Sequence, residues 1–323
     1  MRYLADSTAR HISKIGLGTW QFGSRDWGYG EPYASQVADS IVRRALELGV
    51  TLFDTAEIYG FGRSERILGR ALGDRRESAF LATKILPVLP VPPVVEQRAV
   101  ASADRLGVTR LDLYQVHQPN PLFRDGTIMR GMRALQRVGL VGEVGVSNYS
   151  LERWRAAEAA LGRRVLSNQV RYSLVDRSPE RELIPFAESN DHIVIAYSPL
   201  GQGLLSGRYH RDSRPANRVR AANPLFLPDN LERATDLIAA LREVASAHSA
   251  TPAQIALAWA IHRPAVVAIP GASSVEQMES NAAAAEIELT DDEYRALQAA
   301  SDRFRPVTGP AALVGLARAR LGR

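Results

Sequence analysis

The chain has 323 residues, of which 46% are hydrophobic and 23% are charged, and it contains no cysteine. These values are typical of a globular protein and exclude a disordered, fibrous or disulfide-stapled chain. The formal net charge is +5, but the basic residues are scattered along the chain, so we expect no nucleic-acid partner. Residues 1–6 have no apolar signal-peptide core, and no run of about 18 apolar residues occurs, so we expect a cytoplasmic protein with no membrane partner.

Short β-branched runs alternate with amphipathic helical stretches along most of the chain. The predicted strands cover residues 15–19, 51–54, 80–84, 111–117, 143–146, 167–170, 193–196 and 266–269. The predicted helices cover residues 35–48, 64–72, 94–106, 127–138, 151–160, 179–189, 252–261 and 275–285. Several strands are nearly continuous apolar runs, as expected in a parallel sheet that is buried on both faces. The pattern predicts an α/β fold, a (β/α)8 TIM barrel. A doubly wound sheet is the alternative, but no G-x-G-x-x-G follows the first strand.

Four segments depart from this alternation. Residues 1–14 predict an N-terminal β-hairpin below the barrel. Residues 199–230, rich in proline and glycine, predict a long irregular loop after strand seven, and such loops are usually functional. Residues 231–246 predict an extra helix, and the tail from Pro306 is expected either to fold over one barrel mouth or to be disordered. Because no linker divides the chain, we expect a single barrel domain over residues 1–323.

Three of the apolar strands end in an ionisable residue at the carboxyl face of the predicted barrel. Enzymes with a (β/α)8 barrel have their active sites at this face. Asp54 ends the second strand, Lys84 the third and His117 the fourth, and Tyr59 follows Asp54 by a short loop. We expect Lys84 and Asp54 to pair, because a lone buried charge is costly. The ammonium should lower the pKa of Tyr59 from about 10, which would make it a usable proton donor and acceptor near neutral pH.

Each of these four residues alone has an ordinary structural explanation. Asp54 could cap a turn, Lys84 could extend along the surface, His117 could be a hydrogen-bonded core residue, and Tyr59 could be a turn aromatic. Together, at the ends of successive strands, they predict a site that protonates an alkoxide as it forms from a carbonyl.

Motifs on all eight predicted strands resemble, in order, those of the aldo-keto reductase superfamily. Residues 53–60 (FDTAEIYG), followed by Gly62 and Ser64-Glu65, look like its signature. The other matching segments are residues 16–20, 113–117, 145–149, 168–169, 197–209 and 269–273, with Gln277 and Asn281. The long loop after strand seven resembles the longer bacterial and potassium-channel β-subunit branch. The resemblance covers residues 10–300 and implies a barrel that binds NADPH without a Rossmann fold.

The resemblance also implies a role for each site residue, and no metal. The implied catalytic tetrad is Asp54, Tyr59, Lys84 and His117. The residues implied to bind the cofactor are Thr19, Trp20, Asp54, Ser147, Asn148, Gln169, Tyr197, Ser198, Leu200, Gly201, Gly203, Arg208, Arg218, Gly271, Ser273, Gln277 and Asn281. The residues implied to bind the substrate are Trp20, Trp27, Tyr59, His117 and Gln118. Within the cofactor set, Ser147, Asn148 and Gln169 would hold the nicotinamide carboxamide and Tyr197 would stack on its ring. Arg208 and Arg218 would lie beside the phosphates.

Two positions depart from the family pattern. Residues 271–274 (GASS), in the segment that holds the 2′-phosphate, carry no cation, and Gln277 stands where many members have Arg. A similar segment occurs in the channel β-subunit branch, which binds NADP, so NADP(H) is expected over NAD(H). Gln118 replaces an aromatic residue and should make its side of the pocket more polar, whereas Trp20, Trp27 and Tyr149 are expected to supply apolar walls.

Three functions are compatible with this sequence. The first is NADPH-dependent reduction of aldehydes or ketones to alcohols, with a small-molecule carbonyl substrate and Tyr59 as proton donor. The second is an NAD(P)-dependent sugar or polyol dehydrogenase that uses the same site in the oxidative direction. The third is a redox-sensing binding module on the same fold. For each of them we expect a monomer or a weak homo-oligomer.

Overall fold

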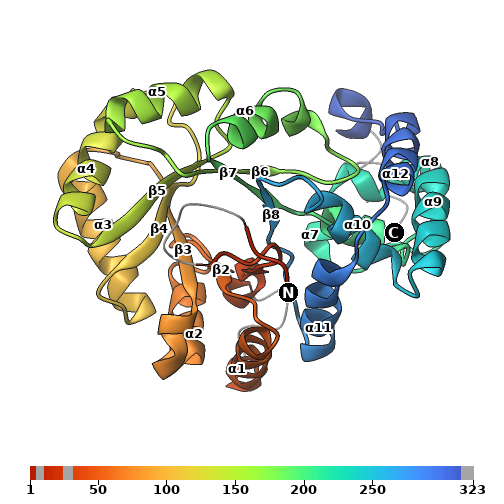
Figure 1. The fold of residues 1–323 in the computed structure, drawn as a ribbon, viewed down its shortest axis with the longest axis horizontal. Helices are drawn as coiled ribbons and strands as arrows, with labels where there is room; N and C mark the ends of the chain where they lie inside the picture. Colours follow the sequence, from red (N-terminus) through yellow and green to blue (C-terminus); the bar gives the residue numbers. More distant parts are fainter. Residues whose placement is uncertain (5–10, 25–31, 314–323) are drawn as a thin grey trace.

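Eight parallel strands form one sheet in sequence order, and its two edges meet. The computed structural model describes residues 1–4, 11–24 and 32–313. The strands are β1 (Leu17–Gly18), β2 (Leu52–Asp54), β3 (Phe80–Ile85), β4 (Leu111–Val116), β5 (Val141–Ser147), β6 (Ser167–Arg171), β7 (Ile193–Tyr197) and β8 (Val266–Ala268). Parallel bridges join Ile15 to Ala268 and Gly18 to Gly271, next to β1 and β8. The sheet therefore closes on itself, and the predicted (β/α)8 barrel is confirmed (Figure 1).

A ring of helices surrounds the strands (Figure 1). Its members are α1 (Pro32–Glu47), α2 (Arg63–Leu72), α3 (Pro92–Leu106), α4 (Asp125–Arg137), α5 (Leu151–Leu161), α6 (Leu183–Ser189), α10 (Pro252–Ala260) and α11 (Val275–Ala283). Several of these helices begin at a side chain that satisfies free backbone N–H groups. Thr251 and Gln254 form a capping box at α10, and Ser150 caps α5. The predicted helix at residues 179–189 is divided into a 3-10 turn (Ser178–Glu180) and α6.

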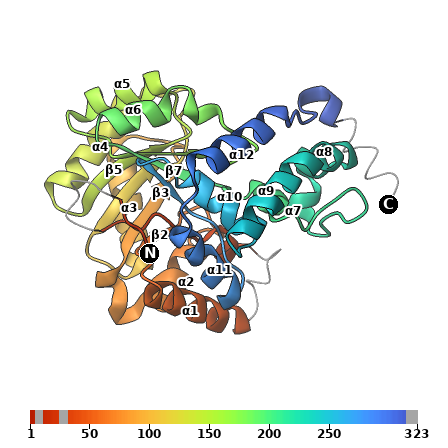
Figure 2. The ribbon, with the colours of Figure 1, turned by 45° about the vertical axis from the view of Figure 1, so that its right-hand side comes forward.

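Additional helices lie to one side of the barrel (Figure 2). They are α7 (Arg218–Ala221), α8 (Pro228–Arg233), α9 (Thr235–Ala247) and α12 (Asp291–Arg303). The prediction of an irregular segment at residues 199–230 is wrong in part, because this segment also contains 3-10 turns at Gly201–Ser206 and Pro224–Phe226. Pro224 and Pro228 stand in the first turns of helical elements, where a missing N–H costs nothing. The extra helix predicted at residues 231–246 is observed as the end of α8 followed by α9.

The N-terminal segment closes the lower end of the barrel. Tyr3 and Ser13 form an antiparallel bridge, and Leu4 N–H donates to the Ile12 carbonyl at 2.9 Å. These bonds fit the predicted hairpin, whose turn lies outside the described residues. Leu4 and Ile12 belong to the apolar cluster inside the barrel, so these two side chains fill its lower end.

The barrel interior changes from apolar to polar along the strand direction. The lower interior is a cluster of buried apolar residues that includes Leu52, Phe80, Leu113 and Leu166, together with residues of β7 and β8. Because side chains on a strand repeat every two residues, the next inward positions can be read from this cluster. On β2, β3 and β4 they are Asp54, Lys84 and Gln115. On β6, Ser167 and Gln169 join them through hydrogen bonds to Gln115 and Asp54, and all five residues are buried. The upper interior is therefore a buried polar layer, and it lies at the carboxyl ends of the strands.

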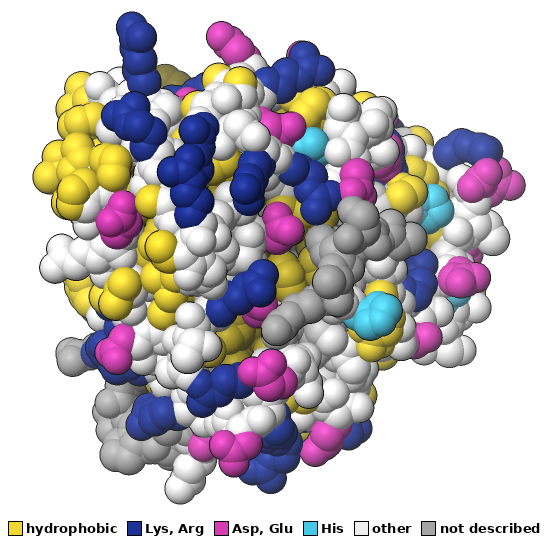
Figure 3. Space-filling model, turned by 60° about the vertical axis from the view of Figure 1, so that its left-hand side comes forward, with side chains coloured by type: hydrophobic (Ala, Val, Ile, Leu, Met, Phe, Trp, Pro, Cys, Tyr) yellow, Lys and Arg dark blue, Asp and Glu magenta, His cyan; other side chains and the backbone are white. Residues whose placement is uncertain are grey.

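The surface carries charges of both signs. On the face shown in Figure 3, Lys and Arg side chains have Asp and Glu between them, and hydrophobic side chains gather at the left edge. Three of the most exposed large hydrophobic residues, Phe61, Val88 and Leu122, follow β2, β3 and β4. Loops after neighbouring strands share the carboxyl rim of the barrel, so this rim is partly apolar.

Candidate active site at the carboxyl end of the barrel

Lys84 is the centre of the polar layer. Its ammonium lies 2.6 Å from Asp54 Oδ1, 2.7 Å from the Thr55 carbonyl oxygen and 3.4 Å from the Tyr59 hydroxyl oxygen. An ammonium has three N–H groups, and each of them has an acceptor here. Burial lowers the pKa of Lys84, but the Asp54 carboxylate and the Tyr59 oxygen outweigh it, so the net pKa is raised. Lys84 therefore stays charged, and its three hydrogen bonds fix the orientation of its ammonium group.

Asp54 receives hydrogen bonds on both carboxylate oxygens. Oδ1 accepts from Lys84, whereas Oδ2 accepts from the Gln169 amide at 2.7 Å and from the Gln115 amide at 3.4 Å. Asp54 is 2% exposed. A buried carboxylate is tolerated when its lone pairs are satisfied, and these donors come from three different strands. The predicted pairing of Asp54 with Lys84 is observed, while Gln169, expected to hold a carboxamide, also bonds to Asp54.

Tyr59 is held in a short loop between β2 and α2. Its N–H donates to the Ala56 carbonyl at 3.0 Å, and Gly60 packs so closely on Gly23 that a Cβ at Gly60 would lie 2.4 Å from the Gly23 carbonyl oxygen. The Tyr59 hydroxyl accepts from Lys84, so its own hydrogen is left for another acceptor. This loop holds the phenol above Lys84.

The expectation that the pKa of Tyr59 is lowered is wrong for the protein alone. Burial of the phenol raises its pKa, and this effect exceeds the opposing attraction of the Lys84 ammonium. The charge of Lys84 could be inferred from the sequence, but the depth at which the phenol lies could not. At neutral pH Tyr59 is therefore a protonated phenol.

His117 faces Tyr59 across the mouth of the barrel. The two rings form an edge contact with centroids 5.8 Å apart. Burial and then the nearby Lys84 charge lower the pKa of His117 to about 4. Its Nδ1 is buried and has no hydrogen-bond partner among the described residues. His117 is thus a neutral imidazole at pH 7, with one ring nitrogen that can donate a hydrogen bond.

A second polar group lies at the ends of β5 and β7. Asn148 has φ = 60°, and its amide nitrogen donates to the Ser147 hydroxyl at 3.1 Å. The Tyr197 hydroxyl donates to Asn148 Oδ1 at 3.0 Å. A non-glycine residue in the left-handed region is uncommon and is often found at functional sites. The structure therefore brings Ser147, Asn148 and Tyr197 together, and the Asn148 amide also donates to the His117 carbonyl at 3.2 Å. Their roles toward a cofactor stay predictions.

The segment after β7 curls in the left-handed region at several consecutive positions. Gly201, Gln202 and Gly203 have φ of 55°, 57° and 101°, and Ser198 has φ = 51°. Leu200 is half-buried beside them. A Cβ on Gly203 would lie 3.6 Å from the Tyr209 ring and 3.9 Å from the Arg220 guanidinium, so Gly203 lies next to a cation, and its φ of 101° favours glycine.

A cation near this curl, Arg220, was not among the predicted residues. Arg208 is exposed, and Arg218 begins α7 with a side chain outside what is described. Arg220 instead donates to the Gln202 carbonyl at 2.9 Å and to the Tyr209 hydroxyl at 3.3 Å. Burial lowers the pKa of Arg220, which nonetheless remains a guanidinium cation. Positive charge and glycines at one curl are suited to anionic oxygens.

The segment at residues 271–281 is bonded mainly to itself. Gln277 is exposed, and its side-chain oxygen accepts from Ser273 N–H at 2.8 Å. Asn281 is 7% exposed and donates to the Gly271 carbonyl at 3.3 Å. The segment is preorganised without a cation of its own, and the cofactor roles of these residues stay predictions.

The residues predicted around the β1 loop are only partly placed. The Thr19 hydroxyl donates to the Asp54 carbonyl at 2.9 Å, so it is turned into the wall of the barrel. Trp20 is 42% exposed, and Gln118 is exposed. Trp27 lies outside the described residues. The suggestion that Tyr149 lines the pocket is wrong, because Tyr149 is buried and its hydroxyl donates to Asp125 at 2.8 Å.

Residues missed by the sequence analysis support the catalytic loop. Gln115 contacts Asp54, and the strand period of two, which places Gln115 and His117 on one face, could have revealed it. Glu57 accepts from Arg98 Nε at 2.9 Å, from Arg98 Nη2 at 2.5 Å and from Leu86 N–H at 2.5 Å. This ion pair fastens the Tyr59 loop to the loop after β3, and the sequence gives no signal for it.

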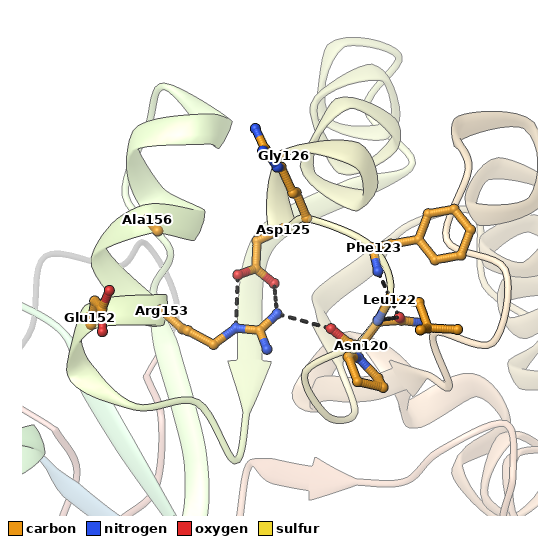
Figure 4. A pocket seen from close by; sticks show the side chains of 10 residues that line it. Asn120, Leu122, Phe123, Asp125, Gly126, Glu152, Arg153 and Ala156 are labelled. Atoms are coloured by element: carbon orange, nitrogen blue, oxygen red, sulfur yellow. Dashed lines mark hydrogen bonds and ion pairs between the residues drawn. The ribbon is translucent and has the colours of Figure 1, made fainter.

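A surface hollow of about 470 Å³ lies outside this polar layer, between the segment after β4 and the start of α5 (Figure 4). Asn120, Leu122, Asp125 and Arg153 line it, with six other residues. The Arg153 guanidinium holds Asp125 with two hydrogen bonds and reaches the Asn120 carbonyl at 3.3 Å. These charges satisfy one another, so the hollow has a structural explanation.

Two searches for other chemistry cover only the residues that the structure describes. Within those ranges no helix is long and apolar enough to cross a membrane. Over the same part of the chain, no group of three or more His, Asp or Glu side chains is placed to hold a metal ion.

Comparison with known proteins identifies the family. The model of the aldo/keto reductase family matches residues 14–302. An uncharacterized oxidoreductase of Mycobacterium tuberculosis is 56% identical over 323 residues, all of both chains. The glycerol dehydrogenase of Gluconobacter oxydans is 27% identical, with a TM-score of 0.85 over 95% of this chain and 98% of its own. An aldo-keto reductase of Klebsiella pneumoniae in complex with NADPH is 28% identical, with a TM-score of 0.76 over 95% of this chain and 96% of its own. The chain belongs to the aldo/keto reductase family and is an NAD(P)H-dependent oxidoreductase of carbonyl or alcohol groups.

Proposed function

We propose that this aldo-keto reductase reduces aldehydes or ketones to alcohols with NADPH, and that Tyr59 is the proton donor. The observation that carries the proposal is the fixed row of Asp54, Lys84 and Tyr59 at the carboxyl end of the barrel. Lys84 Nζ lies 2.6 Å from the carboxylate and 3.4 Å from the phenol oxygen. The row ends in a hydroxyl whose hydrogen is free to be donated.

Bound NADPH would supply a hydride to the carbonyl carbon. Tyr59, protonated at neutral pH, gives its proton to the carbonyl oxygen as negative charge develops there. The phenolate that remains is stabilised by Lys84, whose charge is held in place by Asp54. His117, neutral because its pKa is about 4, donates a hydrogen bond to the same oxygen and orients the carbonyl.

The residues at the mouth fit a nicotinamide cofactor. Asn148 and Ser147 present amide and hydroxyl groups suited to a carboxamide, and Tyr197 presents an aromatic ring. The curl at residues 201–203 has Arg220 behind it, which suits a pyrophosphate. NADPH is preferred over NADH in this proposal because the related Klebsiella protein is solved with NADPH. The cation for a 2′-phosphate would have to come from outside residues 271–274.

Oxidation of a sugar or polyol is the second candidate. It is supported by the TM-score of 0.85 to a glycerol dehydrogenase. The same residues would act in reverse, with Tyr59 accepting the proton of an alcohol.

Replacement of Tyr59 by Phe tests the proton-donor role, because the ring is kept and only the hydroxyl is lost. We expect turnover with NADPH over an aldehyde and ketone panel to fall by about two orders of magnitude or more. Fluorescence titration should give an NADPH affinity within a few fold of wild type. Unchanged turnover would remove Tyr59 from this role, and NADH binding as tightly as NADPH would overturn the cofactor assignment. An alcohol panel with NADP⁺ separates the two candidate functions.

A further inference from the structure

Gln115 occupies a defined place in the polar layer inside the barrel. Its neighbours in strand register are Lys84 on β3 and Gly145 on β5, and Gly145 in turn is paired with Ser167 on β6. The side chains of Gln115, Lys84 and Ser167 are all 0% exposed. Three of the four residues in this register row therefore have polar side chains, whereas the inward residues of the lower barrel form an apolar cluster.

The hydrogen bonds along this row all have the same direction. The Ser167 hydroxyl donates to Gln115 Oε1 at 3.2 Å, which turns the Gln115 amide nitrogen toward Asp54 Oδ2 at 3.4 Å. A hydroxyl that donates to the amide oxygen thus fixes which end of the amide faces the carboxylate. The hydrogen bonds therefore run from Ser167 through Gln115 to Asp54.

Gly145 leaves the space in which the Gln115 and Ser167 side chains meet. A Cβ at Gly145 would lie 2.3 Å from Ser167 Oγ and 2.9 Å from Gln115 Cγ. Any larger residue would push the two side chains apart. The glycine of the G-V-S-N segment is therefore required by the meeting of Gln115 and Ser167 above it.

We propose that Gln115, oriented by Ser167, is a positioning residue that holds the Asp54 carboxylate so that Oδ1 faces Lys84. This inference rests on the proposed function, because it assumes that Lys84 and Tyr59 carry the proton transfer. Gln169 also bonds to Asp54, but in the middle of β6 it is in register with Ser147, whose hydroxyl donates to the Gln169 carbonyl at 2.8 Å. Gln115 lies one row deeper, so it keeps its hold on Asp54 if Gln169 turns toward a cofactor.

Three variants test the proposal in the full-length enzyme. Gln115→Met keeps the length of the side chain but removes the amide. Ser167→Ala removes only the hydroxyl that orients it. Gln136→Met is the matched control, because Gln136 on α4 donates to the Gly142 carbonyl at 2.9 Å and lies outside the site.

We expect Gln115→Met to lower kcat by about tenfold, the effect of losing one hydrogen bond to a charged group, with a smaller loss for Ser167→Ala. The carbonyl KM and the NADPH affinity, measured by fluorescence titration, should stay within about twofold, and Gln136→Met should keep wild-type kcat. A structural role alone would lower the melting temperature and leave kcat unchanged. If Gln115→Met does not fold, Ser167→Ala alone decides, since it removes a single atom.

The pH dependence of Gln115→Glu gives a separate readout. The introduced carboxyl lies against Asp54 and in register with Lys84, which binds Tyr59. The titratable residues of β5 and β6 are Glu143, which is half-buried, and Arg171, which is exposed. Next to the Asp54 carboxylate it should remain protonated well above its usual pKa, and only the protonated form can donate. The ratio of wild-type to variant kcat should therefore rise at least about tenfold between pH 6 and pH 9.

Two results separate the proposals from one another. The role of Gln115 is overturned if the ratio of wild-type to Gln115→Glu kcat does not change with pH and Gln115→Met keeps the wild-type kcat. If Tyr59→Phe is inactive in the same assays, the proposed function stays intact. Full turnover by Tyr59→Phe overturns the proposed function, and the role of Gln115 with it.

Discussion

The ion pair between Glu57 and Arg98 makes a prediction about the loop that carries Tyr59. Glu57 lies between Asp54 and Tyr59, and its side chain is 9% exposed. It accepts two hydrogen bonds from Arg98 and one from Leu86 N–H. We expect Arg98→Met to leave this carboxylate without its cation, and so to loosen the loop and destabilise the fold.

The size of the effect follows from burial. Breaking a fully buried ion pair costs about 3–5 kcal/mol, because one charge is left uncompensated. The Arg98 side chain is 28% exposed, so water screens the pair in part. We therefore expect a loss of about 2 kcal/mol in the free energy of unfolding at pH 8.

The sign of the pH dependence follows from the pKa of Glu57. Burial raises this pKa, while Leu86 N–H and Arg98 oppose the rise. Without Arg98 the folded-state pKa should rise further above the unfolded value, and a raised carboxyl pKa contributes stability at low pH that is lost as the pH increases. The difference between wild type and Arg98→Met should therefore be small at pH 5 and full at pH 8.

Urea unfolding at the two pH values measures this difference. Glu57→Gln combined with Arg98→Met should recover much of the loss at pH 8, because no charge remains buried. Arg44→Met, which removes a partner of two exposed glutamates, is the surface control and should change little. An equal loss at pH 5 and pH 8 would refute the reasoning.

Three further predictions follow from other contacts of the site. Gly145→Ala should destabilise the protein by about 1–3 kcal/mol through overpacking, and Ser167→Ala in the same chain should relieve part of it; additive losses in urea unfolding would contradict this. Because the pKa of His117 is about 4, pH profiles of kcat for carbonyl reduction should show no inflection near pH 6.5, and an inflection that disappears in His117→Asn would contradict it. Arg220→Met should weaken NADPH binding by about tenfold in fluorescence titration, and an unchanged affinity would remove Arg220 from the phosphate site.

The barrel could be predicted because its signals are local. Strands that are buried on both faces are apolar runs, and the helices between them carry their own caps, such as Thr251 with Gln254. The position of Asp54, Lys84 and His117 at strand ends then placed them at one mouth. The motifs of the family added order to this pattern, and the contact of Lys84 with Asp54 and Tyr59 agrees with it.

The rest of the site depends on distances that the sequence does not contain. Gln115 stands between Tyr114 and Val116 in β4, and only its register against Gly145 brings it to Ser167. Arg220 was not among the predicted residues, because which arginine turns toward Gly203 depends on the fold of the segment after β7. The pKa of Tyr59 was given the wrong direction for a related reason: burial is a property of the whole barrel and here exceeds the effect of one charge.

All three N–H groups of Lys84 have acceptors, and this affects the direction in which the reaction can run. Its three N–H groups are directed at Asp54, at the Thr55 carbonyl and at Tyr59, so the ammonium cannot turn away when the phenol loses its proton. Lys84 donates the same hydrogen bond to the Tyr59 oxygen in the phenol and in the phenolate, and this bond is stronger to the charged phenolate. Burial, which keeps the phenol protonated before reaction, favours Tyr59 as a donor, whereas the fixed ammonium limits the cost of the reverse step. Under the proposed function, the row would therefore assist the reaction in both directions, and we expect the ratio of reduced to oxidised cofactor to set which one prevails.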